Sequence, residues 1–191
     1  VAIEKTRKLI NEIAEKSFAE LDAKEIEIKA FQSKDTFFKA QFSISRFLTF
    51  RRMQTTIFVN PLTYEGRAPE EGIRAILAHE LAHAIYYERK NRFQLLGLVS
   101  LINRDFTAKF ERTADLVTIE KGYGSGLISY REWLYSVISE KQITIKKRNY
   151  FTPEELEIII QGYEKNPEIM RSLKKSVPRN LDEVKAVFKE G

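Results

Sequence analysis

The chain has 191 residues, of which 43% are hydrophobic and 12% aromatic, so it is long enough and apolar enough to bury a core. Its 32 basic and 27 acidic residues give a formal net charge of +5, which is mild for this length, and no nucleic-acid partner is expected. Because it has no cysteine, the chain can form neither a disulfide framework nor a thiol nucleophile nor a cysteine-ligated metal site.

The first part of the chain predicts one helix followed by three strands. Residues 3–23 carry apolar side chains at helical spacing, which is typical of an amphipathic helix. Residues 25–30 and 38–45 alternate apolar and polar side chains with a period of two, as in strands with one solvated face. Residues 55–61 form a shorter β-branched strand that ends at an Asn-Pro pair.

From Pro69 onward the pattern is helical almost throughout. Pro69 itself suits the first turn of a helix. Two pairs have the spacing of a capping box at a helix start, and these are Ser129 with Glu132 and Thr152 with Glu155. The order of elements therefore predicts an α+β chain with a mostly helical C-terminal half.

The two histidines of the chain, His79 and His83, lie four residues apart in the sequence HELAH. Positions i and i+4 of a helix lie about 40° apart on one face, so both imidazoles can reach one ion about 2.0 Å from each nitrogen. Glu80 lies beside that face, offset from the ion but near enough to meet a water molecule held there. The spacing therefore predicts a metal site with Glu80 as the general base.

The histidine count restricts the class of metal site. Because the chain has no third histidine and no cysteine, the remaining protein ligand must be Asp or Glu. A di-iron helical bundle would need a second Glu-x-x-His, for which no histidine is left. Two histidines and one carboxylate, with a fourth position open to water, are a catalytic zinc arrangement, so we expect one Zn²⁺ per chain.

Candidates for the carboxylate ligand lie downstream, in residues 109–122. Glu111 and Asp115 are four residues apart, so both can point from one helix face toward the HELAH helix. One of these carboxylates could bind zinc while the other holds a histidine ring. The alternative is an exposed charged face, on which Arg112 is the partner of the acidic residues.

HELAH followed, 28 residues after its second histidine, by Glu-x-x-x-Asp resembles the gluzincin branch of zinc metallopeptidases. The resemblance covers about residues 55–122 and includes compact single-domain members. It implies the zinc ligands His79, His83 and Glu111 and the general base Glu80. It also implies that Asp115 accepts a hydrogen bond from His79 and so fixes the tautomer of that ring.

The resemblance further implies a zincin-like α+β fold. In such a fold, a small antiparallel or mixed sheet of about three strands packs on the HExxH active-site helix. We expect a single metallopeptidase domain over residues 1–191. Its parts are a helix and strands in 1–62, the zinc-binding helices in 69–122 and a helical C-terminal part in 123–191.

The implied activity is that of a zinc-dependent endopeptidase acting on a peptide or protein substrate. Tyr123, in the glycine-rich sequence KGYGSG, is the first candidate for a donor to the oxyanion, followed by Tyr130 and Tyr150. The ordinary role of such tyrosines is packing, and the ordinary role of these glycines is to end a helix and turn the chain. An extended substrate could add to a free sheet edge, either at 37–45 or at 55–60.

Two other functions remain open from the sequence. The first alternative is a latent or catalytically silent zinc-binding module that binds a protein partner. The second is a basic adaptor for nucleic acid whose helix carries HELAH by coincidence. A segment lying in the cleft would indicate the former, and salt-sensitive binding without metal would indicate the latter.

The longest apolar run, residues 93–102, is about half of the roughly 20 residues that a membrane-spanning helix needs. It could rest on a membrane surface, although nothing in the sequence indicates such contact, and core packing is its ordinary role. The chain begins with Val1 rather than Met, so an N-terminal segment could have been removed. Neither the compartment nor the oligomeric state is predicted.

Overall fold

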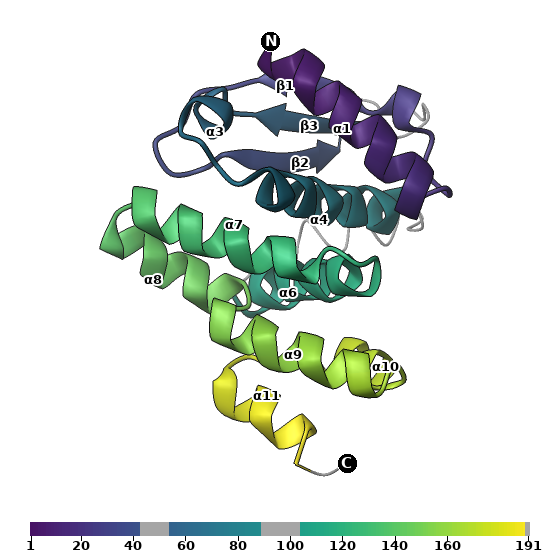
Figure 1. Cartoon of the computed structure of the whole chain (residues 1–191), viewed down its shortest axis with the longest axis vertical. Coiled ribbons are helices and arrows are strands. Elements are labelled where there is room, and N and C mark those ends of the chain that lie inside the picture. The colour runs from purple at the N-terminus through teal and green to yellow at the C-terminus, as the bar shows by residue number, and fades with distance from the viewer. Residues whose placement is uncertain (43–53, 89–103, 190–191) are drawn as a thin grey trace. The chain divides into compact units, whose positions relative to one another are not determined.

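The chain forms two compact units in a computed structural model that describes residues 1–42, 54–88 and 104–189 (Figure 1). The first unit consists of Val1–Ala68 and Ile76–Leu101, and the second of Pro69–Ala75 and Ile102–Gly191. The division falls inside helix α4 (Glu70–Glu88), whose first turns belong to the second unit and whose remainder belongs to the first. The expected single domain over the whole chain therefore stays a prediction.

Besides the larger part of α4, the described part of the first unit contains a helix and a small mixed sheet. Its elements are α1 (Ala2–Ser17), a 3₁₀ turn (Ala23–Glu25), β1 (Glu27–Ala30), β2 (Phe38–Phe42), β3 (Thr55–Val59) and α3 (Leu62–Glu65). Within the described residues the sheet has three strands in the order β1-β3-β2, with β1 parallel and β2 antiparallel to β3. The predicted α+β class and small mixed sheet are confirmed.

The two faces of this sheet differ as the period-two alternation predicts. Ile57 of β3 pairs with Ile28 of β1 and with Ala40 of β2, and the two isoleucines are at most 8% exposed. Helix α1 contacts β1 and β3 (Figure 1), so the apolar residues of the helix and of the sheet are buried against each other. On the opposite face Lys39 lies over the ring of Phe58, with its Nζ 4.8 Å from the ring centroid.

The strand order corrects one expectation about the free edge. Because β3 lies between β1 and β2, both of its sides are hydrogen-bonded, and the prediction that residues 55–60 offer a free edge is wrong. The strand order depends on how the chain crosses over, which local alternation does not record. Residues 43–45, the end of the predicted second strand, and the apolar run 93–102 lie outside the described residues.

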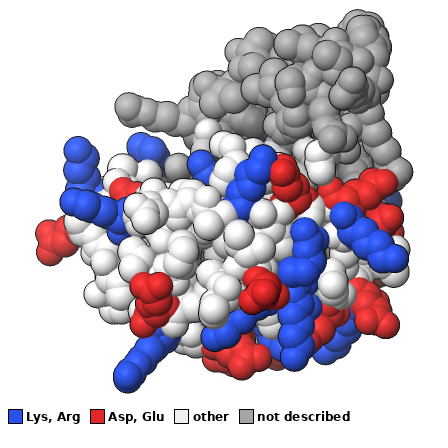
Figure 2. Space-filling model, turned by 90° about the horizontal axis from the view of Figure 1, so that it is seen from above, with Lys and Arg blue, Asp and Glu red and all other residues white. Residues whose placement is uncertain are grey.

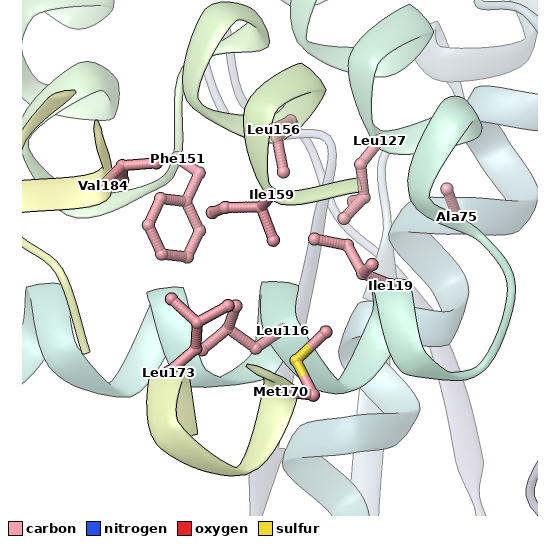
Figure 3. Packing of buried hydrophobic residues seen from close by; sticks show 10 residues of the cluster. All are labelled: Ala75, Leu116, Ile119, Leu127, Phe151, Leu156, Ile159, Met170, Leu173 and Val184. Carbon is pink, nitrogen blue, oxygen red and sulfur yellow. The ribbon is translucent and has the colours of Figure 1, made fainter. Parts of the chain in front are cut away.

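The second unit is helical in its described part. Besides the first turns of α4 it holds α6 (Arg104–Glu120), α7 (Gly124–Val137), α8 (Glu140–Asn149), α9 (Pro153–Lys165), α10 (Ile169–Lys175) and α11 (Leu181–Val187). Its core is a cluster of ten buried residues contributed by most of these helices (Figure 3). Leu116, Phe151 and Ile159 are 0% exposed and lie at its centre. No helix in the described ranges is long and apolar enough to cross a membrane.

Of the two predicted capping boxes, one lies at the start of a helix and the other does not. The capping box at Thr152 is confirmed, since its Oγ1 accepts from the backbone N–H of Glu155 and the Glu155 carboxylate accepts from the N–H of Thr152. The one predicted at Ser129 is wrong, because α7 begins earlier and Ser129 lies inside it, donating to Glu71. Gly122, at φ +89°, ends the preceding helix, as its sequence predicts.

Gly126 lies where α7 approaches the first turns of α4. A Cβ at this position would collide with the backbone carbonyl oxygen of Glu71 and come 2.8 Å from the Cβ of Ala75. The absence of a side chain therefore permits this close approach, and Gly126 is a packing residue within a helix rather than part of a turn.

We predict that Gly126→Ala lowers the free energy of unfolding by about 1–3 kcal/mol, because a backbone atom cannot move aside as a flexible side chain can. Urea denaturation followed by circular dichroism measures this change. The neighbouring Ser125→Ala is the matched control, since Ser125 is exposed on the same helix. Equal stability of the two variants would contradict the close packing.

Candidate metal centre

The two histidines lie on successive turns of α4 and are enclosed there. His79 is 1% and His83 is 5% exposed, and their Nε2 atoms are 3.1 Å apart. Two nitrogens bound about 2.05 Å from a tetrahedral zinc ion lie roughly 3.3 Å from each other. The pair is therefore already spaced as two ligands of one ion, as the i and i+4 spacing predicts.

Glu80 follows His79 directly and is buried with it. The side chain is 5% exposed, in a helix whose neighbouring residues Leu77, Ala78 and Leu81 are fully enclosed. A carboxylate in such surroundings costs free energy unless other groups engage it. Glu80 is thus a buried acidic residue one position after His79, and its role as general base stays a prediction.

Glu111, on α6, completes a group of three possible ligands. One ligand atom from each of His79, His83 and Glu111 lies within 4.8 Å of the other two, and Glu111 is partly buried. The donor set is two imidazole nitrogens and one carboxylate oxygen, which suits zinc and leaves a coordination position for water. The three residues could therefore hold a metal ion.

Asp115, one turn further along α6, is 0% exposed and takes part in a buried ion pair. Its Oδ1 accepts a hydrogen bond from Arg131 at 3.1 Å, and its Oδ2 accepts from Arg131 at 3.4 Å and from the backbone N–H of Phe151 at 3.2 Å. The carboxylate is thus held from two directions. Its expected bond to His79 stays a prediction.

The alternative of an exposed charged face on α6 is wrong. Arg112 is 1% exposed and donates to Glu155 of α9 at 3.4 Å and to the carbonyl oxygens of Lys147 and Pro178. Its guanidinium also lies 4.7 Å from the ring centroid of Phe151. Arg112 therefore ties α6 to the C-terminal helices.

Arg131, on α7, is a buried charged partner of Asp115 that the sequence patterns did not single out. It occupies the buried stripe that Leu127, Tyr130 and Leu134 form on this helix, so a charged residue at helical spacing within an apolar stripe was the available signal. Burial alone would lower the pKa of its guanidinium, but the Asp115 carboxylate raises that pKa, and the net direction is upward. Arg131 therefore carries its charge into the interior.

Of the three tyrosines proposed as oxyanion donors, two lie beside Arg131 and one lies elsewhere in the second unit. Tyr123 precedes the first turn of α7 and packs against the hydrophobic cluster of the second unit. Tyr150 has its ring centroid 4.4 Å from the Arg131 guanidinium, and Tyr130, 3% exposed, lies beside the same group at 5.9 Å. Packing is the role visible for all three, and a role of Tyr123 in catalysis stays a prediction.

No known family, no curated protein and no solved structure matches this chain.

We predict that the protein binds one zinc ion per chain and that His79→Ala or His83→Ala weakens binding by at least about 100-fold, more than loss of an outer-shell partner. Isothermal titration of the metal-free protein measures the affinity. Zinc should also raise the melting temperature of the parent protein but not of these variants. Glu70→Gln, exposed on the same helix, is the control, and tight binding by both histidine variants would contradict the assignment.

Proposed function

We propose that the protein is a zinc-dependent peptidase of gluzincin type, with His79, His83 and Glu111 as zinc ligands and Glu80 as general base. The observation that carries the proposal is the grouping of the three ligand atoms within 4.8 Å, with Glu80 buried next to His79. Two histidines and one carboxylate are a zinc ligand set that leaves room for a catalytic water. The HELAH and Glu-x-x-x-Asp motifs supply the resemblance to this class.

In this proposal each residue has a separate task. Zinc, when bound, lowers the pKa of a water molecule and polarises the carbonyl of the scissile bond. Glu80 takes a proton from the attacking water and returns it to the amine that leaves. Burial keeps bulk water from competing with Glu80 for that proton, and no cysteine or other covalent nucleophile is required.

An extended substrate would add to the sheet at β2. Among the described strands β2 and β1 are at the edges, so of the two edges expected from the sequence only β2 remains. Main-chain hydrogen bonds to such an edge bind a peptide with little dependence on its sequence. Such a mode of binding would suit a peptide or protein substrate.

On the face shown in Figure 2, the distribution of charge favours this proposal over a nucleic-acid adaptor. On the face that Figure 2 shows, basic and acidic side chains of the described residues are interspersed rather than segregated. Nucleic-acid binding generally requires basic residues clustered on one face, because neutralised phosphates supply most of the affinity. We therefore retain a peptide or protein as the partner.

We predict that Glu80→Gln keeps its zinc but loses hydrolysis of a quenched-fluorescence peptide library, with a rate at least about 100-fold lower. The amide has nearly the same shape as the carboxylate and cannot take the proton. Zinc content is measured on the same samples, and Glu70→Gln is the control on α4.

Equal cleavage by the parent and Glu80→Gln at equal zinc content would contradict the role of Glu80. Silence of both, with one zinc per chain, would instead favour the latent or silent zinc-binding module.

A further inference from the structure

Two buried arginines in the described part of the second unit form ion pairs of the same kind but hold different carboxylates. Arg131 and Arg112 are each 1% exposed. Arg131, on α7, pairs with Asp115 of α6, whereas Arg112, on α6, pairs with Glu155 of α9. Only the carboxylate held by Arg131 lies on the same face of α6 as Glu111, because positions i and i+4 are about 40° apart.

Neighbouring side chains restrict the orientation of the Arg131 guanidinium, so Arg131 can in turn restrict the orientation of the Asp115 carboxylate. Its guanidinium lies 4.4 Å from the ring centroid of Tyr150 and 5.9 Å from that of Tyr130, which restricts where the fork of N–H groups points. It donates to both oxygens of Asp115, and the backbone N–H of Phe151 donates to Oδ2. Three donated hydrogen bonds therefore set the plane of this carboxylate.

We propose that Arg131 is a positioning residue of the metal centre: through Asp115 it fixes the face of α6 that presents Glu111. The inference rests on the proposed zinc site but not on peptidase activity. Asp115 cannot rotate out of its contacts without leaving a buried arginine unpaired, so the rotation of α6 about its axis is fixed one turn away from Glu111.

A purely structural role for the buried pair makes a different prediction, and Arg112 is the matched comparison. Arg112 is equally buried, lies next to Glu111 in sequence and bonds Glu155, Lys147 and Pro178. Its contacts hold α6 to the C-terminal helices and include no carboxylate on the Glu111 face. If ion pairing mattered for stability alone, replacing either arginine would have the same effect on metal binding.

The experiment compares Arg131→Lys with Arg112→Lys, using Co²⁺ as the probe metal. Lysine keeps the charge but lacks the planar fork of donors. Affinity is measured by competition with a chromogenic chelator, the ligand geometry by the visible absorption of bound Co²⁺, and folding of the metal-free proteins by thermal unfolding. We predict that Arg131→Lys weakens Co²⁺ binding by about 10-fold and shifts the visible band, because outer-shell partners typically contribute 10- to 100-fold.

Arg112→Lys should lower the melting temperature of the metal-free protein to a similar extent, while its Co²⁺ affinity and visible band stay at the parent values. A parent-like affinity and band in Arg131→Lys would overturn the inference, as would equal losses in both variants. A parent protein that binds no Co²⁺ or Zn²⁺ would overturn the metal centre itself, and the inference with it.

A second variant applies if Arg131→Lys does not fold. Arg131→Gln combined with Asp115→Asn replaces the buried ion pair by two neutral amides and leaves no uncompensated charge. It should fold and bind Co²⁺ about 10- to 100-fold more weakly than the parent, since the anchored carboxylate is gone. Unchanged binding by this double variant would overturn the inference.

Discussion

The enclosure of α4 is the constraint on which the candidate centre depends. Every residue from Ala75 to Ile85 is at most 8% exposed, and most of these side chains are apolar. A helix that is apolar on all sides has to be buried, and it takes its polar residues into the interior with it. Two imidazoles and the Glu80 carboxylate are costly in such surroundings unless other groups engage them, and a cation held by His79, His83 and Glu111 would engage both imidazoles.

The second unit also buries charged side chains, and there ion pairs compensate them. α6 carries Arg112 and Asp115 into the interior next to Leu116, and each charge is met by an opposite charge from another helix. Buried pairs of this kind add little net stability, because removing two charges from water offsets most of their attraction. Such pairs have a larger effect on how the helices are arranged. Any arrangement that separated the two charges would leave a buried charge unpaired, which costs free energy.

Local sequence signals predicted local structure well. The alternation in residues 25–30 and 38–45 predicted two strands, and the described residues form β1 at Glu27–Ala30 and β2 at Phe38–Phe42, although Ala30 is exposed rather than buried. The capping box at Thr152 is confirmed as well. The pair Ser129 and Glu132 has the same spacing as that capping box, yet it lies within α7. There α7 begins earlier, after the turn at Gly122, and Gly126 packs closely against α4, a contact between helices that no local motif encodes.

Long-range features were less accessible from the sequence. HELAH indicated the histidine pair because both histidines lie on one helix, and the downstream motif indicated Glu111 and Asp115. The burial of Arg131 was not predicted. A single arginine in the apolar stripe of α7 indicates an exposed position unless its partner on another helix is known. The central place of β3 was missed for the same reason, since strand order is decided by crossovers.

The most direct test of the metal centre is X-ray absorption at the zinc edge on protein loaded with one zinc per chain. The account predicts a first shell of nitrogen and oxygen ligands at about 2.0–2.2 Å. It also predicts the outer-shell scattering of two imidazole rings, because His79 and His83 are the two histidines of the chain. A shell of oxygen ligands without imidazole scattering would contradict the assignment of both histidines and with it the proposed function.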